Sequence, residues 1–87
     1  MARYTLDIKP SARKELERLS DKLLANLVSR IDGLVVSPRP SACKKLRGYK
    51  DLWRIRFGDH RIVYIIDDDH KTVSVTRIAH RRDVYEQ

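Results

Sequence analysis

Three arginines, at positions 54, 56 and 61, give this sequence its clearest indication of chemistry. Apolar residues at 53, 55 and 57 alternate with Arg54 and Arg56, which is the period-two pattern of a half-buried strand. The following Gly58-Asp59 fits a two-residue turn of type II′, because glycine stands first, and it would set Arg56 opposite Arg61. Like charges directly opposite on one sheet face are destabilising, so the cluster favours a site for an anion. The alternative, a merely solvated basic face, is less expected because such faces usually mix signs.

Composition points to the same kind of partner. The 87 residues are expected to form one small domain, 1–87, with a formal net charge of +7. Positions 44 to 61 hold seven basic residues against two acidic ones, which indicates a phosphate-rich or acidic partner. The single cysteine, Cys43, excludes an intrachain disulfide and is typical of a reducing, cytoplasmic location. The start carries no long apolar run, so neither a signal peptide nor a membrane span is expected.

The elements that would position the arginines follow from periodicity. We predict an α+β fold of the order β-α-α-β-β-β, in which a helical hairpin packs on a small, mainly antiparallel sheet. Ser20 suits the cap of the second helix, and Gly33 near its end suggests close packing there. The predicted elements are a strand over 4–8, helices over 11–19 and from 20 to about 36, a basic loop, strands over 53–57 and 60–66, and a last strand over 72–78.

The last strand should complete the cationic face. A tight turn at Asp67-Asp68-Asp69-His70 would place Lys71 opposite Ile66 and Thr76 opposite Arg61. Thr72, Ser74 and Thr76 would then share the arginine face, and Val73 and Val75 would lie beneath it. Arg77 would fall on the apolar side, so we expect the strand to fray or bulge there.

Taken in order, these motifs resemble a known family. They are Leu46-Arg47-Gly48, Trp53-Arg54-Ile55-Arg56, the run 58–64 (GDHRIVY) and the run 77–85 (RIAHRRDVY). Their order and spacing resemble the RelE/ParE superfamily of bacterial and archaeal toxins, which implies the same fold with a short basic C-terminal tail or helix. The closing HRRDVY is more similar to the RelE branch, whose members cleave messenger RNA in the ribosomal A site, than to the ParE branch, whose members inhibit DNA gyrase.

The resemblance implies a metal-independent endoribonuclease. The ribose 2′-hydroxyl would attack the adjacent phosphate, which requires a base, cations for the transition state and an acid for the leaving oxygen. The implied catalytic positions are Arg54, Arg56, Arg61, Arg81 and Tyr85. Arg61 would hold the phosphate with Arg56 assisting, Arg81 would face the leaving group, and Tyr85 would stack on a base or orient the phosphate.

The sequence does not assign the general acid and the general base as clearly as it assigns the cations. Arginine keeps its proton up to a pH of about 12, so Arg54 is a poor base where some relatives carry lysine. His80 is the tail residue of a type that titrates near neutral pH, and it is the candidate acid or base, although it could merely pack or hydrogen-bond. The three histidines do not have metal-ligand spacing, so we expect no metal and no cofactor.

The sequence also predicts residues that bind RNA and the macromolecules that bind this chain. Candidate RNA-binding residues are Lys44, Lys45, Arg47, Tyr49, Lys50 and Arg82. The family implies a cognate antitoxin whose wrapping segment is amphipathic and partly acidic, together with the ribosome and messenger RNA, and no small-molecule ligand or membrane. Two alternatives remain open: a gyrase inhibitor with the same fold, and a nucleic-acid-binding module without catalysis.

Overall fold

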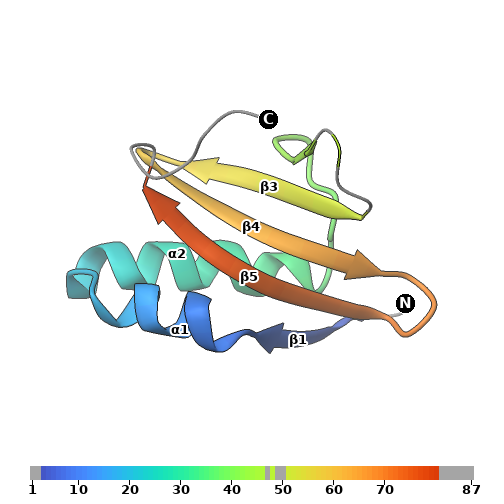
Figure 1. Cartoon of the computed structure of the whole chain (residues 1–87), viewed down its shortest axis with the longest axis horizontal. Helices are drawn as coiled ribbons and strands as arrows, with labels where there is room; N and C mark the ends of the chain where they lie inside the picture. The colour runs from blue at the N-terminus through green and yellow to red at the C-terminus, as the bar shows by residue number, and fades with distance from the viewer. Residues whose placement is uncertain (1–2, 47, 49–50, 81–87) are drawn as a thin grey trace.

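The computed structural model describes residues 3–46, 48 and 51–80 of this chain. It has two helices on one side of a five-stranded sheet, as Figure 1 shows, so the predicted α+β class is confirmed. The elements are β1 (Thr5–Ile8), α1 (Pro10–Glu17), α2 (Asp21–Leu34), β2 (Lys44–Lys45), β3 (Leu52–Phe57), β4 (His60–Asp67) and β5 (Thr72–His80).

The sheet has one strand more than predicted. Its order is β1-β5-β4-β3-β2, with β1 parallel to β5 and the other neighbours antiparallel. The added strand, β2, has only two residues and lies in the predicted basic loop, where Lys44 pairs with Arg54 and Lys45 with Trp53. A strand so short carries no periodic signal, and lysines are common on sheet edges because their charge discourages further pairing.

The hairpin of β3 and β4 has the predicted register. Phe57 pairs with His60, Arg56 with Arg61, and Arg54 with Val63. Gly58 has a φ of 58°, the left-handed value that the first position of a type II′ turn requires. The local turn therefore decides which side chains share a face.

The predicted register between β4 and β5 was wrong. Ile66 pairs with Val73 rather than with Lys71, and Arg61 pairs with Ala79 rather than with Thr76. The turn is set differently because Lys71 takes a left-handed φ of 55° and the Asp67 carboxylate accepts a 3.1 Å hydrogen bond from the His70 N–H.

A bulge in β5 accounts for the rest of the difference. Tyr64 pairs with Val75 and Val63 with Arg77, so Thr76 is the extra residue. The expected irregularity near Arg77 is therefore present, one residue earlier. Beyond the bulge the faces exchange, and Arg77 shares a row with Val63 and Arg54 on the side of the sheet away from the helices.

The core lies between the helices and the near face of the sheet. Ala12 and Leu16 of α1 and three residues of α2 are buried there. The buried residues are Ala12, Leu16, Leu27, Ile31, Leu34, Ile55, Ile62, Tyr64, Ile66, Val73, Val75 and Ile78. Each of these strand residues points towards the helices, so the arginines between them are left on the opposite face.

The helix ends follow local chemistry. Pro10 occupies the first turn of α1, where its missing N–H is not needed. The predicted cap, Ser20, accepts a 3.3 Å hydrogen bond from the Leu23 N–H at the start of α2. The suggestion of close packing at Gly33 was wrong, because a Cβ added there would meet no atom within 4 Å. Neither helix is both long and apolar enough to cross a membrane.

Candidate nucleic-acid interface

The far face of the sheet carries the predicted arginine cluster. The two-residue turn makes Phe57 and His60 a hydrogen-bonded pair, so the next pair, Arg56 and Arg61, is of the closer, non-hydrogen-bonded kind. Arg54 lies on the same face of the same strand. Two arginine side chains that start from directly opposite positions on one face can both reach one phosphate.

Burial differs among the three arginines. Arg56 is exposed and Arg54 is half-buried, whereas Arg61 is only 8% exposed and is the one buried charged side chain among the described residues. A buried arginine side chain loses little conformational entropy when it binds a ligand, so Arg61 is suited to bind a phosphate in one fixed position.

Strand β2 adds one cation to this face and turns another away from it. Lys44 pairs with Arg54 and therefore lies in the row of the arginine cluster. Lys45 pairs with Trp53, whose row faces the helices. Of the two predicted RNA-binding lysines on β2, the structure brings only Lys44 to the arginines.

His80 is not brought to the arginine cluster. It pairs with His60 at the end of the sheet, in the helix-facing row of Phe57. The two imidazole rings meet edge to face, with centroids 5.1 Å apart, beside a hollow of about 160 Å³ that Glu15 and Arg18 help to line. Within the described ranges no group of three or more His, Cys, Asp or Glu side chains is arranged to hold a metal ion.

Six predicted site residues lie outside the described residues. They are Arg47, Tyr49, Lys50, Arg81, Arg82 and Tyr85.

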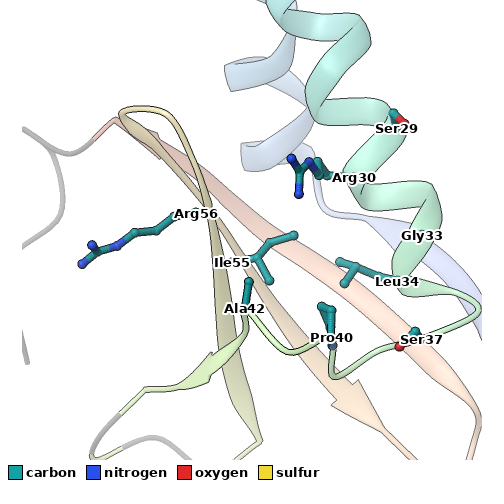
Figure 2. A pocket seen from close by; sticks show the side chains of 9 residues that line it. All are labelled: Ser29, Arg30, Gly33, Leu34, Ser37, Pro40, Ala42, Ile55 and Arg56. Carbon is teal, nitrogen blue, oxygen red and sulfur yellow. The ribbon is translucent and has the colours of Figure 1, made fainter.

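A hollow of about 220 Å³ lies beside the arginine cluster, between α2 and β3 (Figure 2). We call it the α2–β3 hollow. Arg30 lies at its rim, with the guanidinium carbon 5.1 Å from the centre of the Phe57 ring. Figure 2 shows Ile55 directed towards α2 and Arg56 pointing to the opposite side of β3. The lining residues are Ser29, Arg30, Gly33, Leu34, Ser37, Pro40, Ala42, Ile55 and Arg56.

The loop below this hollow is fixed by Arg39, a residue that sequence reasoning missed. Its guanidinium lies 5.0 Å from the centre of the Trp53 ring and forms a 2.9 Å ion pair with Asp68. Asp68 also accepts a 2.6 Å hydrogen bond from the Tyr4 hydroxyl. The hydrogen bond from Arg39, and to a smaller extent the one from Tyr4, stabilises the carboxylate and holds the pKa of Asp68 below its usual range. The turn between β4 and β5, which contains Asp68, therefore holds the loop that contains Arg39 against the sheet.

Tyr64 fastens the same loop from the core. The side chain is fully buried, and its hydroxyl donates a 2.8 Å hydrogen bond to the Pro38 carbonyl. Burial raises the pKa of Tyr64 well above its usual value.

Arg77 is the second residue that sequence reasoning missed. Its Nη2 lies 2.9 Å from Oε2 of Glu15 in α1, so this arginine of the far face is ion-paired. A signal for its placement was present in the sequence. The buried positions 73, 75 and 78 are spaced by two and then by three, which is the spacing that a bulge produces.

Comparisons with known proteins agree with the fold. Residues 6–85 match the family described as the ParE toxin of the type II toxin–antitoxin system parDE. The chain is 34% identical over 83 residues to Toxin RelG of Mycobacterium tuberculosis, which covers 94% of this chain and 95% of that protein. It is 32% identical over 88 residues to the mRNA interferase toxin RelE of Escherichia coli K12, covering 97% and 92%.

A solved structure agrees as well. The toxin–antitoxin complex RelBE2 from Mycobacterium tuberculosis contains a chain that matches with a TM-score of 0.80 and 33% identity, covering 92% of this chain and all of that one. The extent of these matches, over the strands and helices that build the basic face, shows that this chain belongs to the RelE/ParE superfamily and is a RelE-like toxin of a type II toxin–antitoxin system.

Proposed function

We propose that this toxin is a ribosome-dependent endoribonuclease that cuts messenger RNA in the ribosomal A site. The observation that carries the proposal is the close cross-strand pair of Arg56 and Arg61 on a face with Arg54 and Lys44. A relative that is 32% identical over 88 residues bears the name mRNA interferase, which supports the same activity here.

The arginines would act on the phosphate. Attack by the ribose 2′-hydroxyl forms a bond to phosphorus and breaks the bond to the 5′ oxygen, leaving a cyclic phosphate and a free 5′-hydroxyl. Negative charge gathers on the phosphate oxygens on the way, and forked guanidinium donors at Arg61 and Arg56 would stabilise it. Guanidinium is a source of charge and of hydrogen-bond donors rather than a base, so the arginines would act on the charge of the phosphate.

The proposal rests on these arginines and not on His80. Its ring lies against His60 on the helix-facing side, so proton transfer by His80 would require the ring to reach the other face of the sheet. A cleavage rate that stays level across the range where histidine titrates would exclude this role. The roles implied for Arg81 and Tyr85 remain part of the proposal.

The ribosome is included because a chain of 87 residues has little surface with which to orient a flexible message. Presentation of the strand in a fixed geometry by the A site would supply the missing orientation. Equal cleavage rates on naked and ribosome-bound message would contradict this part of the proposal.

We also propose a cognate antitoxin, with the α2–β3 hollow as one of its contacts. The hollow has an apolar lining with Arg30 at its rim, which suits an apolar side chain with a carboxylate beside it. The matched chain from Mycobacterium tuberculosis was solved in a toxin–antitoxin complex, which supports a partner of this kind.

The decisive experiment adds purified toxin to programmed ribosomes and maps message ends by primer extension. We expect cuts within the A-site codon for the wild type. Arg61→Gln should still sediment with ribosomes but should cleave at least about 100-fold more slowly, because one transition-state donor is lost. Thermal unfolding of the variant checks that loss of cleavage does not come from loss of the fold.

A second candidate function is inhibition of DNA gyrase, which the match to a family described as ParE favours. Intact message on ribosomes, together with inhibited supercoiling by purified gyrase, would select it.

A further inference from the structure

Side chains of α1 continue the outer edge of β5 where β1 stops. Strand β1 pairs with β5 only as far as Val75. Beyond that point the Ser11 hydroxyl donates a 2.8 Å hydrogen bond to the Thr76 carbonyl, and Oε1 of Glu15 accepts a 2.7 Å hydrogen bond from the Ile78 N–H. Four helical residues rise about 6 Å. Two strand residues span about 6.6 Å, so one helical turn matches this edge.

The second oxygen of Glu15 holds Arg77. Oε2 accepts hydrogen bonds from Nη2 at 2.9 Å and from Nε at 3.3 Å. The Glu15 side chain is 26% exposed and that of Arg77 is 49% exposed. This double contact directs the guanidinium to the rim of the sheet, against α1.

The position of Arg77 gives this contact a consequence for the basic face. Because of the bulge at Thr76, Arg77 is opposite Val63, which is itself opposite Arg54. Two strand spacings, about 10 Å, therefore separate Arg77 from Arg54 in one row of the far face. An arginine side chain released from Glu15 could turn inward over Val63 and add its charge to the cluster.

We propose that Glu15 is a specificity-determining residue that withdraws the charge of Arg77 from the RNA-binding face. This inference rests on the proposed function, since it takes the arginine cluster as the RNA-binding surface. Each cation that contacts phosphate strengthens binding to any RNA, whatever its sequence or setting. Pairing Arg77 with Glu15 limits this general affinity and leaves more of the toxin free for ribosome-bound message.

The test compares Glu15→Gln with Glu17→Gln. Glutamine at 15 keeps an acceptor for the Ile78 N–H but loses the ion pair with Arg77, and Glu17 is an exposed acid on the same helix whose replacement changes the net charge equally. The probe is a fluorescein-labelled 12-nucleotide oligouridine, and binding is measured by anisotropy over a range of salt concentrations.

We expect Glu15→Gln to bind the oligouridine more tightly than the wild type at low salt, with a slope of log affinity against log salt that is steeper by about 0.7, the value for one further contact to single-stranded phosphate. The gain should vanish in Glu15→Gln/Arg77→Gln. Equal slopes for Glu15→Gln and Glu17→Gln, or a gain that persists in the double variant, would overturn the inference.

Two further measurements keep the causes separate. Ser11→Ala removes a hydrogen bond from the same edge without changing charge, so it should lower the melting temperature and leave the salt slope unchanged. Cleavage of ribosome-bound message is assayed in parallel. A wild type that leaves the message intact while Glu15→Gln shows the steeper slope would refute the proposed function alone, and cleavage without a change of slope would refute the role of Glu15 alone.

Discussion

The two arginines that face each other across the hairpin differ in exposure, and this difference suggests a division of labour. Arg61 is 8% exposed, whereas Arg56 is exposed and points away from α2 (Figure 2). A held guanidinium can mark a fixed position for the scissile phosphate, and a free one can follow the charge as it develops. Replacement of Arg56 should therefore cost less activity than replacement of Arg61.

Tyr64 allows a test at the level of a single hydroxyl. Tyr64→Phe removes the hydrogen bond to the Pro38 carbonyl and should lower the free energy of unfolding by about 1 to 2 kcal/mol at pH 7. Urea denaturation followed by tryptophan fluorescence measures the change. An unchanged midpoint would show that the loop does not depend on this bond.

The same residue predicts an alkaline dependence. An unfolded tyrosine ionises near pH 10, whereas burial keeps Tyr64 protonated in the fold, so above about pH 10 the unfolded state binds fewer protons and stability falls as pH rises. This loss should be smaller in Tyr64→Phe. The remaining loss reports the other tyrosines, among them Tyr4, whose hydrogen bond to Asp68 raises its pKa.

At the scale of the elements, the two hairpins show how far the sequence could be interpreted. The register of β3 and β4 was predictable because a strict alternation meets a two-residue turn beginning with Gly58, and both signals are local. The register of β4 and β5 was not, because it depends on a left-handed Lys71, a side-chain bond from Asp67 and a bulge at Thr76. Of these features, only the bulge leaves a trace in the sequence, in the spacing of the apolar positions 73, 75 and 78.

The candidate site was predictable to the same extent. Arg54, Arg56 and Arg61 come from the local hairpin, and their common face followed from period two alone. The inclusion of Lys44 and the ion pairing of Arg77 depend on β2 and α1, which are remote in the sequence. His80 was assigned by residue type, and the exchange of faces after the bulge places it with His60 instead.

The bulge itself can be tested by deleting Thr76. Without the extra residue, Val75 and Arg77 would be neighbours in a regular strand, so Arg77 would stay opposite Val63 and Ile78 would stay in the core. The deletion should therefore cost only the hydrogen bonds of Thr76, about 1 to 3 kcal/mol, and leave the chain folded. Thr76→Ala loses only the hydrogen bond to the Val63 carbonyl and should cost about 1 kcal/mol. Circular dichroism during thermal unfolding measures both. A deletion variant that is unfolded at room temperature would show that the pairs on the two sides of Thr76 cannot join into a regular ladder.

Helix α2 carries a glycine that stability alone does not require. Gly33 lies in the last turns of the helix, where an added Cβ meets nothing within 4 Å, so Gly33→Ala should stabilise the fold by up to about 1 kcal/mol. Gly33→Leu should instead extend into the α2–β3 hollow and weaken antitoxin binding without lowering the melting temperature. Titration calorimetry with the antitoxin separates the two variants, and unaltered affinity of the leucine variant would place the antitoxin elsewhere.

For the molecule as a whole, the excess of 19 lysines and arginines over 12 acidic residues predicts strong dependence on ionic strength. With the ribosome as the proposed target, attraction to the basic toxin would speed their encounter, so kcat/KM should fall by about tenfold or more between 50 and 200 mM salt, while kcat at saturation changes little. Sucrose at matched osmolality serves as the control. A kcat/KM that is insensitive to salt would mean that charge does not guide the encounter.

The parallel pairing of β1 with β5 joins the first strand of the sheet to the last along the sequence, Thr5 to Thr72 and Ile8 to Val75 (Figure 1). The first strand made must therefore wait for the last before the sheet can close, and α1 finds its own partners on β5 only then. While β5 is still inside the exit tunnel of the ribosome, β1 and β4 have no strand between them and the sheet cannot form. The order of synthesis thus delays closure of the sheet until the last of its strands has left the tunnel.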